Sequence, residues 1–152
     1  MATPISFPST TQNYALPLLF SGQAQKEFFL NQALSVVDAL LQRRVEQVQA
    51  DPPSDPAEGS CYIVASPATG EWAGKEDDIA VRIGGEWHFI TPRGGETLFD
   101  AGSGALVHYD SGWSSPVEPV AANGGTTIDA EARQMLNELV EALKNAGIFA
   151  KS

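Results

Sequence analysis

Cysteine and positive charge are what this sequence has least of. Cys61 is the single cysteine in 152 residues, which excludes an internal disulfide and a cysteine-based zinc cluster. Lysine and arginine total 9 against 19 aspartate and glutamate residues, giving a formal net charge of -10. Nucleic acids and anionic membrane surfaces both attract basic proteins, so we expect neither as a partner.

Long apolar runs and a secretion signal are also missing. No stretch approaches the roughly 18 apolar residues that cross a bilayer, so we expect no membrane insertion. The first residues, Met-Ala-Thr-Pro-Ile-Ser-Phe-Pro, lack the basic and apolar regions of a signal peptide, so we expect synthesis in the cytoplasm. The chain does contain 43% apolar residues, enough for a folded core, and its patterns predict an α+β protein.

The first third of the chain divides into an arm and a helix. Residues 1–22 contain three prolines, which predict an extended anchoring arm. Residues 23–50 are predicted as a long amphipathic helix that the proline-rich run Asp51–Pro56 ends. Its apolar face suits packing on a sheet or on copies of the same helix. The positions that we assign to oligomerisation are Leu30, Leu34, Val37 and Leu41, and the same period continues through Val45 and Val48.

Residues 57–116 are predicted to form a small antiparallel β domain. β-Branched and aromatic segments alternate there with glycine turns, which is typical of short hairpins rather than of parallel strands joined by helices. Cys61 falls in the first of these segments, where a small buried apolar role is favoured over that of a nucleophile.

Two segments of this β domain repeat weakly, Val81–Trp87 and Val107–Trp113. We prefer a three-residue loop in both, which sets the third residue of each segment opposite its tryptophan. In the second segment Gly112 then occupies the left-handed position of the loop. The alternative for the first segment is a two-residue Gly-Gly turn, which places Arg82 beside Trp87.

The end of the chain is predicted as a linker and a helix. Residues 117–125 have the composition of a linker, and residues 126–148 have helical periodicity. Behind a glycine-rich hinge, this helix either bundles between chains or folds back on its own domain. We favour bundling, through Leu136, Leu139 and Leu143.

Catalytic motifs are absent, so we expect neither enzyme activity nor a cofactor. His88 and His108 are interpreted as polar strand residues rather than metal ligands. The run Glu76-Asp77-Asp78 lacks the ligand spacing of a calcium loop and is interpreted as a solvated turn. A glycan depolymerase is the least favoured reading, because nothing fixes the separation of its candidate carboxylates, Glu86, Glu96, Asp100 and Asp110.

Three tryptophans give the sequence its one candidate ligand site. Trp72, Trp87 and Trp113 each follow a glycine closely, which places each ring at the start of a strand leaving a turn. Such rings can stack on sugars and form a glycan-binding platform. The alternative, which we favour, is that they close the core of a small sheet.

Several motifs resemble, in order, a known family. They lie at Leu16–Glu27, Asn31–Leu34, Pro52–Val64, Gly70–Gly74, Gly85–Phe89 and Pro92–Gly94. Together they resemble an uncharacterised domain that recurs in tail-fibre-type proteins of proteobacterial phages, prophages and gene transfer agents. The resemblance covers about residues 14–116 and brings no catalytic residues.

The resemblance implies a virion protein of the tail, either a tail fibre or a tail-tip component. It implies a homotrimer by analogy with fibres, other tail or baseplate proteins as neighbours, and a host-surface glycan as the adhesive target. A protein of a different class, a stand-alone carbohydrate-binding module that uses the three tryptophans, is the alternative.

Overall fold

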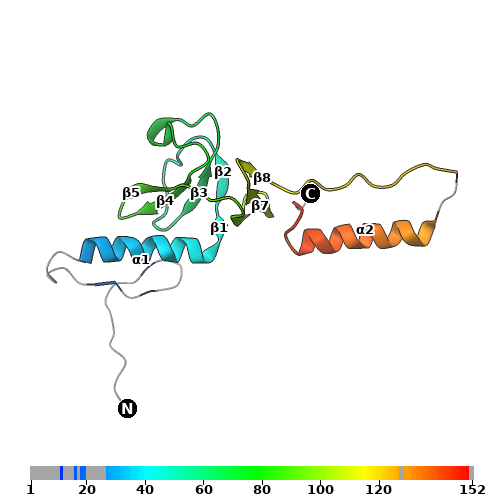
Figure 1. Ribbon diagram of the computed structural model, residues 1–152, viewed down its shortest axis with the longest axis horizontal. Helices are drawn as coiled ribbons and strands as arrows, with labels where there is room; N and C mark the ends of the chain where they lie inside the picture. Colours follow the sequence, from blue (N-terminus) through cyan, green and yellow to red (C-terminus); the bar gives the residue numbers. More distant parts are fainter. Residues whose placement is uncertain (1–10, 12–15, 17, 20–26, 127–128, 151–152) are drawn as a thin grey trace, which may run out of the picture. The chain divides into compact units, whose positions relative to one another are not determined.

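The computed structural model describes residues 11, 16, 18, 19, 27–126 and 129–150. It is an α+β protein with an N-terminal helix, two small sheets and a C-terminal helix (Figure 1). The chain divides into two compact units, residues 1–91 and 92–152. The predicted arm, residues 1–22, lies largely outside the described residues.

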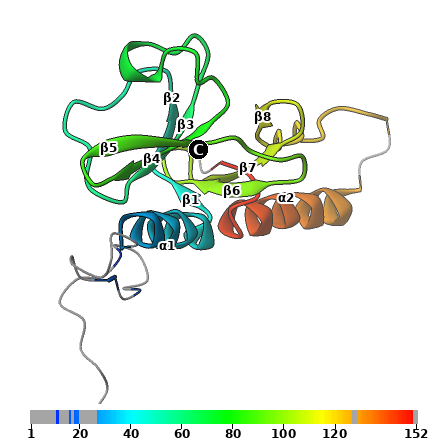
Figure 2. The ribbon, with the colours of Figure 1, turned by 60° about the vertical axis from the view of Figure 1, so that its left-hand side comes forward.

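Unit 1 is a helix packed on a four-stranded sheet. Helix α1 spans Glu27–Gln42 and contacts β4 (Figure 2). The sheet has the order β2-β3-β4-β5, with β2 parallel to β3 and the other pairs antiparallel. The elements after α1 are β1 Arg44–Val45, β2 Gln47–Gln49, β3 Cys61–Val64, the 3-10 turn η1 Gly70–Trp72, β4 Ile79–Ile83 and β5 Glu86–Ile90.

The predicted helix 23–50 is too long. Arg43 takes a left-handed φ of 48°, which ends α1 well before Asp51. Val45 and Val48 lie in strands, where β-branched residues alternating with polar ones fit the pleat. Within the predicted β domain, residues 57–116, all strand pairs are antiparallel as expected, whereas β2, which precedes that range, pairs in parallel with β3 and makes the sheet mixed.

The β4–β5 hairpin differs from the preferred three-residue loop. Gly84 and Gly85 have φ values of 62° and 79°, which define a two-residue turn, and Arg82 pairs with Trp87. The carboxylate of Glu58 accepts hydrogen bonds from both glycine N–H groups, at 2.5 and 3.3 Å. The two-residue turn is favoured because both positive φ values fall on glycines and because the carboxylate of Glu58 binds their N–H groups.

This register sorts the side chains of the sheet onto two faces. Ala80 and Trp87 share one face with the buried cluster around Trp72. The opposite face carries Cys61, Val81 and His88 and turns toward α1, where Gln32 Nε2 lies 3.0 Å from His88 Nδ1.

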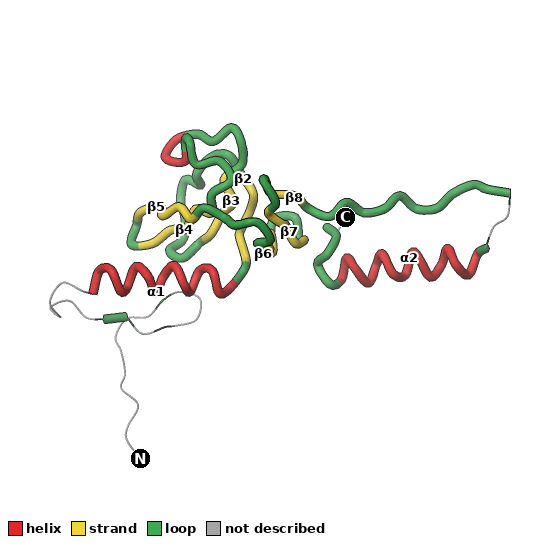
Figure 3. The backbone as a smooth tube through the Cα atoms, in the orientation of Figure 1, coloured by secondary structure: helices red, strands yellow, loops and turns green. Residues whose placement is uncertain are grey.

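Unit 2 has an antiparallel sheet of β6 Thr97–Asp100, β7 Ala105–Tyr109 and β8 Trp113–Ser114, followed by helix α2 Ala130–Asn145 (Figure 3). The β7–β8 loop has three residues and pairs Tyr109 with Trp113, so the prediction for this hairpin is confirmed. The left-handed residue of the loop is Ser111, with φ 62°, rather than Gly112.

Helix α2 is four residues shorter at its start, and three at its end, than the predicted 126–148; residues 127–128 lie outside the described part. Asp129 caps it by accepting a hydrogen bond from Ala132 N at 2.9 Å. Gly147 ends it, and its carbonyl accepts a hydrogen bond from Leu106 N in β7 at 2.7 Å. The end of the chain thus returns to the sheet, while the predicted linker 117–125 has no regular structure.

Candidate interaction surfaces

Trp72 is a core residue and not part of a glycan platform. Its ring has 0% exposed surface, and its centroid lies 5.7 Å from Tyr62 and 5.1 Å from Trp87. The turn η1 positions it, and Gly70 there takes a φ of 57° close to Pro52. The platform of three tryptophans is therefore wrong, and the core interpretation holds for Trp72.

Trp87 and Trp113 are half-buried and belong to different units. The guanidinium of Arg82 lies 5.2 Å from the centroid of Trp87, and Lys75 Nζ lies 5.3 Å from that of Phe89. Trp113 lies 5.2 Å from Tyr109 in the other sheet. In unit 1 the rings of Trp87 and Phe89 thus each have a cation over one face.

Two of the candidate carboxylates, Asp100 and Glu96, accept hydrogen bonds from the backbone of turns. Among the described residues, no three histidine, cysteine, aspartate or glutamate side chains gather to hold a metal. Asp100 is buried and accepts hydrogen bonds from Gly102 N and Ser103 N, at 3.0 and 3.3 Å. Glu96 accepts one from Arg93 N at 3.2 Å.

No described helix is long and apolar enough to cross a membrane.

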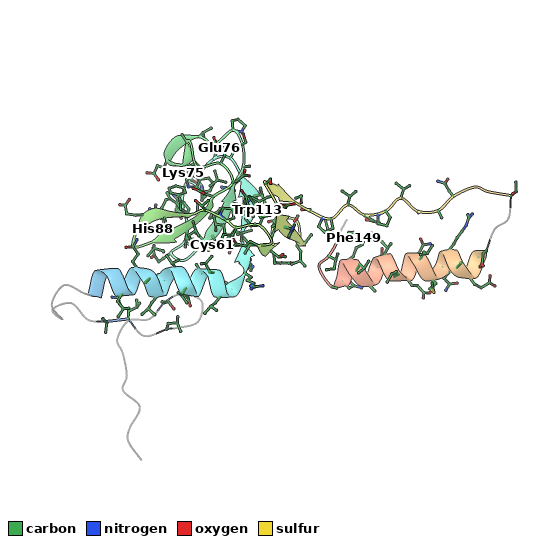
Figure 4. All side chains as sticks on the ribbon, in the orientation of Figure 1. Cys61, Lys75, Glu76, His88, Trp113 and Phe149 are labelled. Atoms are coloured by element: carbon green, nitrogen blue, oxygen red, sulfur yellow. The ribbon has the colours of Figure 1, made fainter. Side chains whose placement is uncertain are left out.

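Glu76 lies beside Lys75 between η1 and β4 (Figure 4). Its carboxylate accepts a hydrogen bond from Ala68 N at 3.2 Å. Hydrogen bonds from its own N–H and from that of Ala68 lower the pKa of Glu76. The acidic run is therefore organised as a turn, as the sequence predicts.

Cys61 is buried in the core of unit 1. Burial, with the carboxylates of Glu46 and Asp38 adding to it, raises the pKa of the Cys61 thiol from 9.0 to about 12. The thiol stays protonated in the fold but ionises near pH 9 once unfolded. Its contribution to stability is therefore complete below pH 9 and is lost as the pH rises toward 12.

We expect native Cys61 to be inert to Ellman's reagent at pH 8, because only an accessible thiolate attacks. In urea the same chain should release one equivalent of the chromophore. A native reaction as fast as that of the unfolded chain would contradict the buried placement.

Helix α1 presents an apolar stripe away from the sheet. Leu30, Val37 and Leu41 are 47%, 46% and 58% exposed, and Leu34 between them is half-buried. Ala39, on the opposite side of the helix, is buried, and so is Asp38 at the edge of the stripe. The four positions assigned to oligomerisation thus share a face that the rest of the described chain leaves largely uncovered.

Helix α2 presents a second stripe. None of its 16 residues is buried, and Met135, Leu136 and Leu139 are 63%, 49% and 51% exposed. Leu143 is half-buried. A 16-residue helix in water is marginal unless its apolar face packs on something. Other described residues, those of 118–122 among them, lie near this stripe but leave Met135, Leu136 and Leu139 about half exposed, so the stripe still calls for a partner.

Asn31 fastens the arm to α1 at one point. Its Oδ1 accepts a hydrogen bond from Leu19 N at 2.8 Å, and its Nδ2 donates to Leu19 O at 3.0 Å. The side-chain amide of Asn31 thus makes the two hydrogen bonds with the backbone of Leu19 that a neighbouring strand would otherwise make. Sequence reasoning missed this contact, although both residues lie within the motifs at Leu16–Glu27 and Asn31–Leu34.

The structure is thus a small α+β protein of two units. Its two helices expose apolar faces, and in unit 1 Arg82 and Lys75 lie over the rings of Trp87 and Phe89. The chain belongs to the family described as "Protein of unknown function (DUF2793)", whose family model matches residues 30–114, more than half of the chain. No curated protein matches it.

Proposed function

We propose that this protein is a structural and adhesive component of a phage or gene-transfer-agent tail, a tail fibre or tail-tip protein that assembles as a homotrimer. The observation that carries self-assembly is the uncovered stripe of α2, together with that of α1. The place in a tail is supported by the ordered motifs that resemble tail-fibre-type proteins, and other tail or baseplate proteins are the neighbours that this place implies.

For the adhesive role we propose contact with host surface polysaccharide. Trp72 is excluded by its burial, so this role falls to the half-buried rings of Trp87 and Trp113. A glycan array on the wild-type chain, Trp87→Ala and Trp113→Ala tests it, with folding checked by circular dichroism. Binding that survives both substitutions, or that no glycan elicits, overturns this part of the proposal.

Self-assembly is tested by light scattering on the full chain at micromolar concentration. We expect three times the chain mass of 16.2 kDa. The apolar stripes that each chain offers to its copies would drive the association, and the number three is taken from the resemblance to fibre proteins. A stable monomer would contradict the proposal. The place in a virion is tested separately, by searching purified tail-bearing particles from the source bacterium for peptides of this chain, and their absence would overturn it.

A further inference from the structure

A groove runs between the linker and α2 within unit 2. It holds about 300 Å³ and is walled on one side by the linker and on the other by the apolar side of α2. The linker residues that line it are Glu118, Pro119, Val120, Ala121 and Ala122, and the main apolar helix residues are Leu136, Leu139, Val140 and Leu143.

Two cations of α2 hold the linker along the helix. Arg133 donates hydrogen bonds to the carbonyl oxygens of Ala122 and Gly124, the first at 3.5 Å. Near the other end of the helix, Lys144 Nζ lies 3.1 Å from Glu118 Oε1 and 3.2 Å from Glu141 Oε1. These contacts raise the pKa of Lys144. The linker is thus fixed at both ends of the groove.

The area of α2 shows why the linker matters. Its 16 residues make it about 24 Å long and about 11 Å across. Half of the side surface of such a cylinder is roughly 400 Å², about half of the roughly 800 Å² that each partner buries in a stable interface. A bundle of α2 helices alone therefore buries too little area for a stable interface. The linker is the apolar surface that lies beside α2 and can add to this area.

The charge pattern favours a second copy as the occupant. The outer side of α2 carries Glu131 and Glu138, and the groove itself is bordered by Glu118, Arg133 and Glu141, whereas the stripe consists of leucines and small alanines. A chain of net charge -10 can approach its own copy at this uncharged stripe with the least repulsion. Large leucines and small alanines on the same stripe also suit packing of the stripe against itself.

We propose that the groove receives the apolar stripe of α2, with Leu136, Leu139 and Leu143, from a second copy of the chain. Linker residues 119–122 then form part of the subunit interface. This rests on the proposed self-assembly and names the surfaces that meet. Arg133 and Lys144 act by holding the linker where it widens the interface. Val120, which is 91% exposed, then becomes buried on assembly.

Two valines of the same linker make a matched test in the full chain. Val120 lines the groove, whereas Val117, which is 88% exposed, does not. We expect Val120→Asp to lower the trimer fraction at 10 µM at least tenfold in light scattering, and Val117→Asp to leave it unchanged. Two trimeric variants would overturn the inference and leave self-assembly standing, whereas a monomeric wild type would overturn both.

A crosslinking experiment covers the case in which Val120→Asp loses its fold. A tagged Val120→Cys chain and an untagged Leu139→Cys chain are coexpressed and oxidised with copper phenanthroline. The mixed disulfide dimer should form, because each thiol can reach the other only between copies, and buried Cys61 contributes little background. A coexpressed trimer that yields no mixed dimer would exclude this docking mode.

Discussion

Replacing Trp72 by alanine is expected to destabilise unit 1 by about 3–5 kcal/mol. The ring has no exposed surface and packs against Tyr62, Val64 and Ala80, so its removal leaves a cavity in the core on that face of the sheet. Since small domains are stable by only about 5–15 kcal/mol, the variant should lie near its unfolding transition at 25 °C.

Urea denaturation followed by far-UV circular dichroism measures this effect without relying on tryptophan fluorescence. Trp72→Phe is the matched variant, because it keeps an aromatic ring and should lose clearly less stability. Trp113→Ala, at a half-buried ring of the other unit, should also cost less. An unchanged urea midpoint for Trp72→Ala would return Trp72 to the candidate glycan-binding residues.

Replacing Leu139 by aspartate is expected to convert the assembled protein to monomers. The side chain is 51% exposed and lies in the middle of the α2 stripe, so the change should spare the fold of the chain. In an assembly each copy would bury an unpaired carboxylate, at a cost of several kcal/mol. Association should therefore weaken at least about hundredfold, which corresponds to about 2.8 kcal/mol.

Light scattering across a dilution series measures this loss, and circular dichroism checks the helix. Gln134→Asp is the matched control, because it adds the same charge on the opposite side of α2, where Gln134 donates to Glu138. It should leave the mass unchanged. If Leu139→Asp and Gln134→Asp both keep the wild-type mass, the α2 stripe is not an assembly surface.

Part of the fold could be predicted from local patterns. The apolar period locates both helices, and the glycine turns locate the hairpins. The end of α1 could not be predicted in this way, because Val45 and Val48 continue the helical spacing by coincidence. What ends the helix is the left-handed Arg43, and arginine has no intrinsic preference for that conformation.

The sequence also left two features of unit 1 undetermined for a different reason: the parallel strand β2 and the burial of Trp72. The parallel pairing of β2 with β3 depends on the loop of residues 50–60, whose course no local period encodes. The burial of Trp72 likewise depends on a loop turn that folds back on the sheet, so the sequence alone leaves core and platform open.

The motifs behind the resemblance have physical roles in holding the fold together. Glu58 joins the loop before β3 to the turn between β4 and β5, and Asn31 joins α1 to the arm. These are contacts between segments distant in sequence. Their residue types were visible in the sequence, whereas their partners became evident only from the structure.

The contact between Asn31 and Leu19 restricts which residue position 31 tolerates. The side-chain amide of Asn31 offers a donor and an acceptor on two separate atoms, which meet the C=O and the N–H of Leu19. An ionised aspartate of the same shape would set a negative oxygen against that carbonyl. Deamidation of Asn31 would therefore replace the donor to Leu19 O by an acceptor and remove that hydrogen bond.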